Sequence, residues 1–222
     1  MRGVFVTGTD TGVGKTVLAA AVCAALRARG ERVVAWKPVV TGTDEPGEPD
    51  HELLARASGT HPSEVAPLTF EPAVSPHLAA ELAGSTIDPA ALVASARAAA
   101  GGAEILVVEG VGGLLVPLTL GFLVRDLARE VGLPVVIAAR PGLGTINHTL
   151  LTVEAARAVG LRVLGVVLTP WPEVPSVMER SNRETIERLA GVEVSTLPPL
   201  PRADTELLAA AGAELPLDAW LD

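Results

Sequence analysis

The stretch that most constrains the fold is G-T-D-T-G-V-G-K-T at residues 8–16. It fits the pattern G-x-x-x-x-G-K-[S/T], follows an apolar run at 2–7 and opens an alanine-rich run at 16–29. In this arrangement the backbone N–H groups of the glycine-rich turn point at an anion, and the helix dipole adds to the attraction. The segment therefore predicts a phosphate-binding loop between a strand and a helix.

The rest of the chain alternates short β-branched runs with helical stretches. Strands are expected at 2–7, 32–37, 104–109, 134–139, 162–168 and 192–197, and helices at 16–29, 50–58, 76–84, 88–100, 122–131, 145–159 and 176–190. Continuous apolar strands separated by helices indicate a mostly parallel sheet that is buried on both faces. We therefore expect a single α/β domain over residues 1–222, with a P-loop NTPase-like fold and helices on both faces of the sheet.

Charge and cysteine content narrow the class of partner. The formal net charge is −9, which argues against nucleic acid and anionic lipid, because both need clustered positive charge. The single cysteine, Cys23, lies among alanines and leucines and is interpreted as a small buried hydrophobe. No apolar stretch reaches the roughly 18 to 20 residues of a spanning helix, and no signal peptide is apparent. We expect a cytoplasmic protein with a small-molecule partner.

Lysine usage points to a chemical site. The chain has 17 basic residues, of which only Lys15 and Lys37 are lysines. Lys37 ends an apolar strand, and the carboxyl ends of parallel strands gather ligands at one edge of the sheet. A compact ammonium is therefore expected beside the phosphate-binding loop, in a role that a planar guanidinium would not fill.

Two further residues fit a nucleotide site. The Thr16 hydroxyl, next to Lys15 in the loop motif, is expected to bind Mg²⁺. Glu109 ends the strand I-L-V-V-E and is expected to complete the metal shell, as a Walker B acid does. One branch of partitioning ATPases has a second lysine five residues before the motif lysine; here that residue is Asp10, which is interpreted as structuring the loop.

Five segments together resemble the dethiobiotin synthetase family: T-G-T-D-T-G-V-G-K-T at 7–16, W-K-P-V-V-T-G at 36–42, S-P-H at 75–77, V-E-G-V-G-G at 108–113 and L-G-T-I-N-H at 143–148. The resemblance covers most of the chain and weakens after about residue 169. It implies an ATP- and Mg²⁺-dependent ligase that converts 7,8-diaminopelargonate and carbon dioxide to dethiobiotin, the penultimate step of biotin synthesis. A carbamate and then a carbamic-phosphoric anhydride would be intermediates, and the site must stabilise their negative charge.

The resemblance also implies roles for individual residues. The catalytic residues would be Lys37, Lys15 and Glu109, and the metal ligands Thr16, Asp50 and Glu109. Among the loop acids Asp44, Glu45, Glu48 and Asp50, the family pattern selects Asp50. Nucleotide-binding residues would be Gly12, Val13, Gly14, Lys15, Thr16, Val17, Asp50, Glu109, Gly110, Val111, Gly112, Thr169, Pro170, Leu197, Pro198 and Pro199. Substrate-binding residues would be Thr11, Lys37, Thr41, Gly144, Thr145, Ile146 and Asn147.

A homodimer is implied as well, in which the turn at 142–147 binds the carboxylate tail of the substrate held by the neighbouring subunit. A helix start presents free N–H groups to an anion, which suits this role. Capping and packing remain the alternative for Asn147 and His148. Thr169 stands where some family members have an asparagine that reads the adenine ring. His77 is interpreted as structural, and Asn182 is left open, with a surface position as one interpretation.

Two other classes stay in view. An amide ligase of corrin synthesis has a similar nucleotide domain, but it also carries a glutaminase domain with a reactive cysteine, whereas this chain has only Cys23 in an apolar helix. A partitioning or scaffold ATPase is the non-enzymatic alternative. The missing loop lysine and the acidic composition weigh against it.

Overall fold

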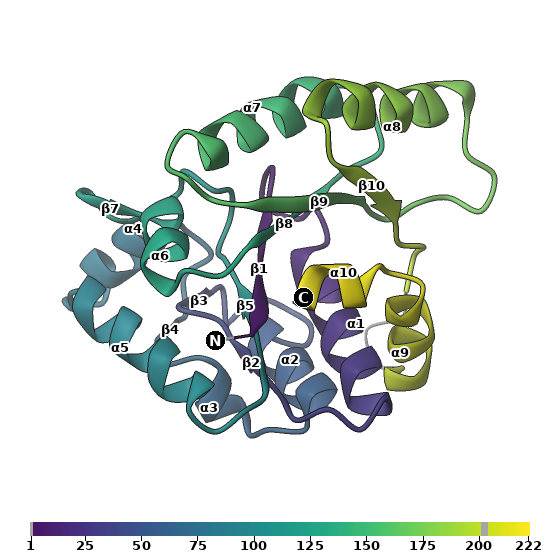
Figure 1. Cartoon of the computed structure of the whole chain (residues 1–222). Coiled ribbons are helices and arrows are strands. Elements are labelled where there is room, and N and C mark those ends of the chain that lie inside the picture. The colour runs from purple at the N-terminus through teal and green to yellow at the C-terminus, as the bar shows by residue number, and fades with distance from the viewer. Residues whose placement is uncertain (1, 201–203) are drawn as a thin grey trace.

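The computed structural model describes residues 2–200 and 204–222 (Figure 1). The expected domain, 1–222, therefore includes residues outside this description. The strands are β1 (Gly3–Gly8), β2 (Val33–Trp36), β3 (Val40–Thr41), β4 (Thr69–Phe70), β5 (Ile105–Glu109), β6 (Pro117–Thr119), β7 (Phe122–Leu123), β8 (Val135–Ala139), β9 (Val163–Leu168) and β10 (Glu193–Thr196). The helices are α1 (Lys15–Ala28), α2 (Asp50–Ser58), α3 (Pro62–Val65), α4 (Pro76–Leu82), α5 (Pro89–Ala100), α6 (Val124–Val131), α7 (Thr145–Arg157), α8 (Val177–Ala190), α9 (Thr205–Ala213) and α10 (Leu217–Leu221).

The central sheet has six strands in the order β10-β9-β8-β1-β5-β2, and every neighbouring pair is parallel. β1 and β5 pair in the middle of the sheet, with Val6 opposite Glu109. The carboxyl ends of β1, β2 and β5 therefore lie side by side at one edge, and the phosphate-binding loop, Lys37 and Glu109 follow or end these strands.

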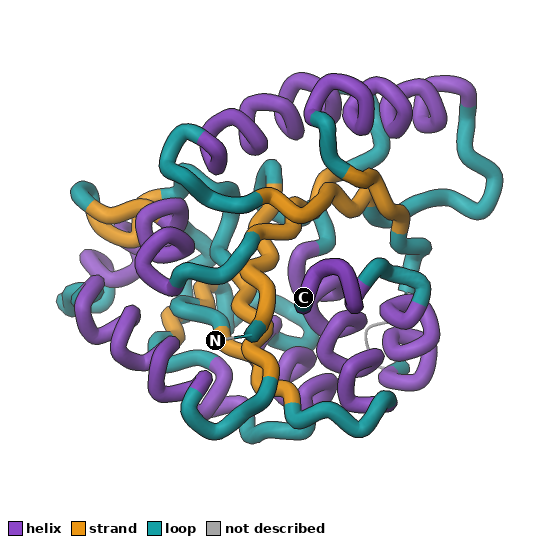
Figure 2. The backbone as a smooth tube through the Cα atoms, in the orientation of Figure 1, coloured by secondary structure: helices purple, strands orange, loops and turns teal. Residues whose placement is uncertain are grey.

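Helices cover both faces of the sheet (Figures 1 and 2). Alternate residues of one strand point to opposite faces: Val4 and Val6 of β1 pack in the core that includes α1, α2, α9 and α10, whereas Phe5 packs with α5, α6, α7 and α8. The expected fold, a mostly parallel sheet with a helical layer on each side, is confirmed.

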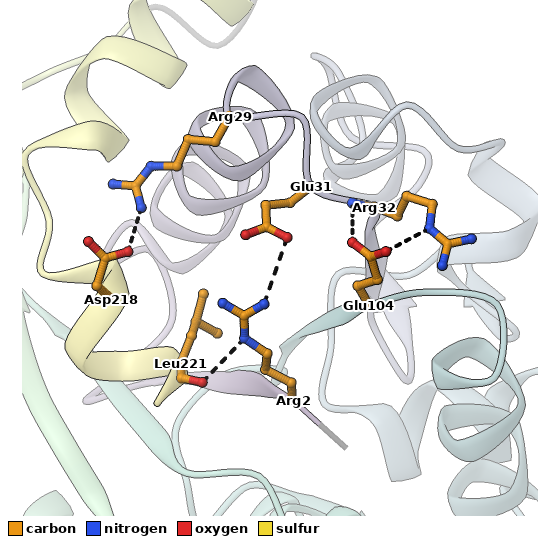
Figure 3. Close-up of polar contacts among 7 residues, drawn as sticks. All are labelled: Arg2, Arg29, Glu31, Arg32, Glu104, Asp218 and Leu221. Carbon is orange, nitrogen blue, oxygen red and sulfur yellow. Dashed lines mark hydrogen bonds and ion pairs between the residues drawn. The ribbon is translucent and has the colours of Figure 1, made fainter.

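The opposite edge of the sheet, at the amino ends of the strands, is held by polar contacts (Figure 3). Arg32 Nε lies 3.1 Å from Glu104 Oε1, which ties the starts of β2 and β5, and Arg2 Nε donates to the Leu221 carbonyl at 3.3 Å. The second bond brings the C-terminal helix α10 to the start of β1. An exposed ion pair such as Arg32–Glu104 contributes at most about 1 kcal/mol, so it holds this edge only weakly.

The structure adds elements that the sequence patterns did not predict. Helix α9 packs along α1 so closely that a Cβ on Gly212 would lie 2.1 Å from the Ala21 carbonyl oxygen. The expected helix at 122–131 begins only at Val124, because residues 122–123 form β7, which pairs with β6 in a hairpin. In the described part of the chain, none of the helices has the length and apolar character needed to cross a membrane.

Candidate active site

A cavity of about 560 Å³ opens at the carboxyl ends of β1, β2 and β5. The phosphate-binding loop and the first turn of α1 form one wall, and Lys37, Thr41 and Asp50 form another. Glu109 and the glycine-rich segment after β5 also line the cavity. These three segments are distant in sequence and follow strands that are adjacent in the sheet, and residues 73–76 contribute a fourth part of the lining.

The phosphate-binding loop depends on glycine at two positions. Gly14 immediately precedes α1 with φ of 88°, in the left-handed region, and a Cβ there would meet Thr169 Cγ2 at 2.7 Å. Gly8 has little room as well, since its Cβ would lie 2.7 Å from Val13 Cγ2. The loop wraps tightly because these positions carry no side chain.

Lys15 is folded back over the loop, with Nζ donating to the Asp10 carbonyl at 2.8 Å. Asp10 in turn accepts from the Thr11 N–H through Oδ1 at 2.7 Å and pairs with Arg140 through Oδ2 at 3.0 Å, so it structures the loop as expected. Burial lowers the pKa of Lys15 from 10.5 to about 8, with Glu109 opposing this shift and Lys37 adding to it. The ammonium is thus held in a place where an anion would stabilise it strongly.

Lys37 is held by two carboxylates in the interior. Its Nζ lies 2.5 Å from Glu109 Oε1 and 3.2 Å from Asp50 Oδ2, and only 3% of Lys37 and 1% of Glu109 are exposed. Burial alone would lower the pKa of Lys37, but the two carboxylates outweigh it and raise the pKa, so the lysine stays charged. Burial raises the pKa of Glu109, whereas the positive charges of Lys37 and Lys15 act to lower it.

The oxygen atoms around Glu109 fit a hard cation. The Thr16 hydroxyl donates to Glu109 Oε1 at 2.9 Å, and the buried Oε2 has no hydrogen-bond partner among the described residues. Mg²⁺ prefers oxygen ligands and keeps several waters, so a hydroxyl and one or two carboxylates suffice. Within residues 2–200 and 204–222 no three His, Cys, Asp or Glu side chains form a metal cluster; the candidate set here is Thr16, Glu109 and Asp50.

Most of the predicted site residues meet at this cavity. Its lining includes Thr11, Gly12, Gly14, Lys15, Thr16, Val17, Lys37, Thr41, Asp50, Glu109, Val111 and Gly112. Val13 and Gly110 do not line it. The Val13 side chain is buried in the core, and Gly110 packs against Phe5 and Val124. Only their backbone groups are therefore candidates for ligand contact.

The residues predicted to lie around the base form a separate group beside the loop. Thr169 lies against Gly14 of the phosphate-binding loop, and the Trp171 N–H donates to the Leu197 carbonyl at 2.7 Å. The segment after β9 that contains Pro170 is thereby joined to the end of β10, which Pro198 and Pro199 follow. None of these residues lines the main cavity.

The turn at 142–147 also lies outside the main cavity. Gly144 and Asn147 are exposed at the start of α7, Thr145 is buried and Ile146 is partly buried. Helix α7 instead borders a second cavity of about 400 Å³ through His148, Leu151, Thr152 and Ala155. Thr11 and Val116 line both cavities, so the two cavities adjoin.

Sequence reasoning missed one wall of the main cavity and misjudged one polar residue. Ala73, Val74, Ser75 and Pro76 line the cavity, although the S-P-H segment drew attention only to His77, whose Nδ1 lies 3.1 Å from Ser75 Oγ. The surface interpretation of Asn182 is wrong. Only 7% of Asn182 is exposed, and its Nδ2 donates to the carbonyls of Pro141 and Gly142. A helical pattern alone could not show this, because the acceptors come from another segment.

Comparisons with known proteins place this site in context. The family model described as "AAA domain" matches residues 2–206. The curated relatives include three named "ATP-dependent dethiobiotin synthetase BioD". The protein from Anaeromyxobacter dehalogenans (strain 2CP-1) is 52% identical over 76% of this chain and 76% of its own. The protein from Haloferax mediterranei is 42% identical over 97% of this chain and 92% of its own. The protein from Bacillus licheniformis is 40% identical over 90% and 86%, respectively.

Solved structures show a similar fold at low sequence identity. A ParA family ATPase from Chlorobium tepidum superposes with a TM-score of 0.59 at 14% identity, covering 96% of this chain and 90% of that one. The MinC:MinD cell division complex from Aquifex aeolicus gives a TM-score of 0.58 at 16% identity, covering 95% and 86%. These likenesses support the fold alone, and the chemistry follows from the close relatives and the site.

Proposed function

The chain belongs to the ATP-dependent dethiobiotin synthetase family, and we propose that the cavity at the ends of β1, β2 and β5 is where it closes the ureido ring of dethiobiotin. The enzyme is a ligase of biotin synthesis that uses ATP. The observation that carries the assignment of the site is the convergence of both lysines, Lys15 and Lys37, on one cavity beside the buried Glu109. In this proposal residues 1–222 act as a single ligase domain.

The first step forms a carbamate. One amine of 7,8-diaminopelargonate attacks carbon dioxide, a nitrogen–carbon bond forms, and the amine proton leaves to solvent. The product carries a carboxylate where the diamine carried an amine. Lys37, whose raised pKa keeps it an ammonium, stabilises this charge, and Thr41, which lines the same cavity, binds the substrate beside it.

The second step transfers the γ-phosphoryl group of ATP. A carbamate oxygen attacks phosphorus, the bond to ADP breaks, and a carbamic-phosphoric anhydride forms. The backbone from Gly12 to Val17 holds the phosphates, and Lys15 neutralises the transferred group. Thr16, Asp50 and Glu109 would hold Mg²⁺, which supplies charge neutralisation at the phosphate oxygens when bound. The second amine then attacks the anhydride carbon, so that the ring C–N bond forms, the C–O bond to phosphate breaks, and the amine loses a proton to the departing phosphate or solvent.

The nucleotide base and the carboxylate tail of the substrate bind in two regions beside the main cavity. Thr169, Pro170 and residues 197–199 border the base, supported by the contact of Thr169 with the phosphate-binding loop. The backbone N–H groups at 144–147 bind the carboxylate tail of the substrate that is held by the neighbouring subunit of a homodimer. The enzyme works in the cytoplasm. Two exposed apolar side chains on this face, Leu143 in the loop and Leu151 on α7, support an interface between two copies. The exposed fraction is 93% for Leu143 and 57% for Leu151.

The deciding experiment measures phosphate release by the purified protein with Mg²⁺ and ATP. Diaminopelargonate and bicarbonate are each added alone and then together. We expect release to rise only when both are present, with dethiobiotin formed in equal amount. Release that is independent of both substrates would favour a nucleotide-switched ATPase, whose fold this chain shares, and would end the ligase assignment of this cavity.

A further inference from the structure

Asn182 is a buried polar residue that the site described above does not include. It lies on α8, and its Nδ2 donates to the Pro141 carbonyl at 2.9 Å and to the Gly142 carbonyl at 3.3 Å. These two carbonyls belong to the turn that joins β8 to α7. A side-chain amide offers two donors on one nitrogen, which matches two successive acceptors.

The same turn sets the start of α7. The Gly142 carbonyl also accepts from the Thr145 N–H at 3.2 Å, and Gly144 adopts a left-handed φ of 89° immediately before the helix. Among the residues that the structure describes, a second side-chain contact beside this turn is the pair Arg140–Asp10, in which both side chains are more than half exposed. Exposed pairs hold a backbone weakly, so Asn182 is the buried anchor of the turn.

The orientation of that turn decides where the helix start can bind an anion. N–H groups in the first turn of a helix have no acceptor within the helix, and at α7 these include the N–H groups of Ile146 and Asn147. A hydrogen bond to a carboxylate needs a donor within about 3.2 Å and good alignment. A small rotation of the 141–144 backbone would therefore move the donors away from a bound carboxylate.

We propose that Asn182 is a positioning residue for substrate binding, which fixes the turn at 141–142 so that the start of α7 receives the carboxylate tail of the substrate. This inference rests on the proposed function, in which that tail binds at 144–147. Asn182 itself touches no substrate; it acts through the backbone of the turn.

The test compares 7,8-diaminopelargonate with its methyl ester, which keeps both amines and lacks the carboxylate charge. Wild-type enzyme is expected to have a higher kcat/KM for the free acid. Asn182→Asp keeps the side-chain size but faces both carbonyls with oxygen in place of a donor. We expect its kcat/KM for the acid to fall by about tenfold or more, whereas the value for the ester and the KM for ATP change less than about threefold.

Arg183→Ala is the matched control. Arg183 follows Asn182 on the same helix and donates to the Val194 carbonyl at 3.0 Å, so its loss weakens the packing of α8 without touching the turn. This variant should keep the preference for the acid. If Asn182→Asp does not fold, Asn182→Ser takes its place; it retains one donor on a shorter side chain and should lose part of the preference.

Each outcome decides between the two claims. A wild-type enzyme that does not distinguish acid from ester refutes the tail site, and the role of Asn182 falls with it, while dethiobiotin formation and the assignment of the main cavity stand. A wild-type preference that survives in Asn182→Asp overturns the positioning role alone. Equal losses for acid and ester in Asn182→Asp mean that Asn182 only stabilises the fold, which also overturns it.

Discussion

Lys37 Nζ lies 2.5 Å from Glu109 Oε1, and the same oxygen accepts a hydrogen bond from Thr16 Oγ1 at 2.9 Å. One carboxylate oxygen therefore joins the end of β2, the end of β5 and the first turn of α1. Asp50 adds a second carboxylate, whose Oδ2 lies 3.2 Å from the Lys37 Nζ. A buried ammonium, its counter-charges and the phosphate-binding loop thus form one electrostatic unit.

Lys37→Arg is expected to lower the rate of dethiobiotin formation by about 100-fold or more, the scale of losing one electrostatic contact to the reacting group. A planar guanidinium is larger than the ammonium that fits between Glu109 and Asp50, and its charge is spread over three nitrogens. Steady-state turnover measures the effect, and calorimetric titration with ATP should show nearly unchanged nucleotide affinity. Near-normal turnover of the arginine variant would refute the need for a compact ammonium.

The Lys37–Glu109 pair is expected to be strongly coupled in stability. Lys37→Met leaves a buried carboxylate without its nearest counter-charge and should lower the free energy of unfolding by about 3 kcal/mol. Adding Glu109→Gln removes that charge, so the double variant should recover most of the loss. Urea unfolding of the wild type, both single variants and the double variant gives the coupling energy. Additive losses would show that the two side chains do not depend on each other.

Lys37 is also expected to oppose the binding of a divalent cation in the absence of nucleotide, because its ammonium contacts oxygen atoms of two proposed metal ligands, Glu109 and Asp50. At such short range like charges repel by several kcal/mol even in a partly screened site. Lys37→Met should therefore bind Mn²⁺ about tenfold more tightly than wild type, measured by electron paramagnetic resonance. The charge-retaining Lys37→Arg is the control and should bind as weakly as wild type. Weaker binding by the methionine variant would instead mean that Lys37 orients the ligands.

Nucleotide binding is expected to take up a proton above about pH 8. The pKa of Lys15 is lowered by burial to about 8, so the free enzyme loses this proton as the pH rises through that value. Bound phosphates favour the ammonium and restore the proton. Calorimetry in two buffers of different ionisation enthalpy should show proton uptake at pH 9 and little from this group at pH 7. ATP affinity should fall as pH rises above 8; an affinity that rises would contradict the assignment.

The same shift has a defined sign for stability. The folded pKa of Lys15 lies below its ordinary value of 10.5, so between about pH 8 and 10.5 the unfolded chain binds more protons than the folded one. In this window the Lys15 contribution to the free energy of unfolding increases with pH. Below pH 8 both states are protonated and the contribution is constant.

Gly14→Ala is expected to abolish tight ATP binding, whereas Gly30→Ala should not. Both glycines have similar left-handed backbone angles, with φ of 88° and 85°. An alanine in this conformation is strained, so both variants should lose about 1–2 kcal/mol of folding stability. Only at Gly14 would the new Cβ meet a neighbour, Thr169 Cγ2 at 2.7 Å. Adding Thr169→Ser, which removes that methyl group, should restore part of the affinity. Equal ATP affinities of the two alanine variants would exclude the steric explanation.

Site residues could be predicted from the sequence where the pattern that marks them lies within one short segment. The phosphate-binding loop could be predicted because strand, glycines, lysine and helix lie within one short segment, and Lys37 and Glu109 because each ends an apolar strand. The lining by residues 73–76 could not, since that loop reaches the cavity only through contacts such as the Gly42 N–H donating to the Pro72 carbonyl at 3.1 Å. The burial and hydrogen bonds of Asn182 could not be predicted either, because its acceptors are carbonyls on a turn that is distant in sequence.

The sequence by itself determined the parallel α/β fold and the two lysines at the edge of its sheet, because hydrophobic period and loop chemistry are properties of neighbouring residues. Only the tertiary structure decided that Lys37 and Thr16 meet on one oxygen of Glu109 with Asp50 beside the lysine, that α9 packs along α1, and that Asn182 anchors the turn before α7. Hydrogen bonds form only when donor and acceptor lie about 3 Å apart, so they depend on which segments the folded chain brings side by side.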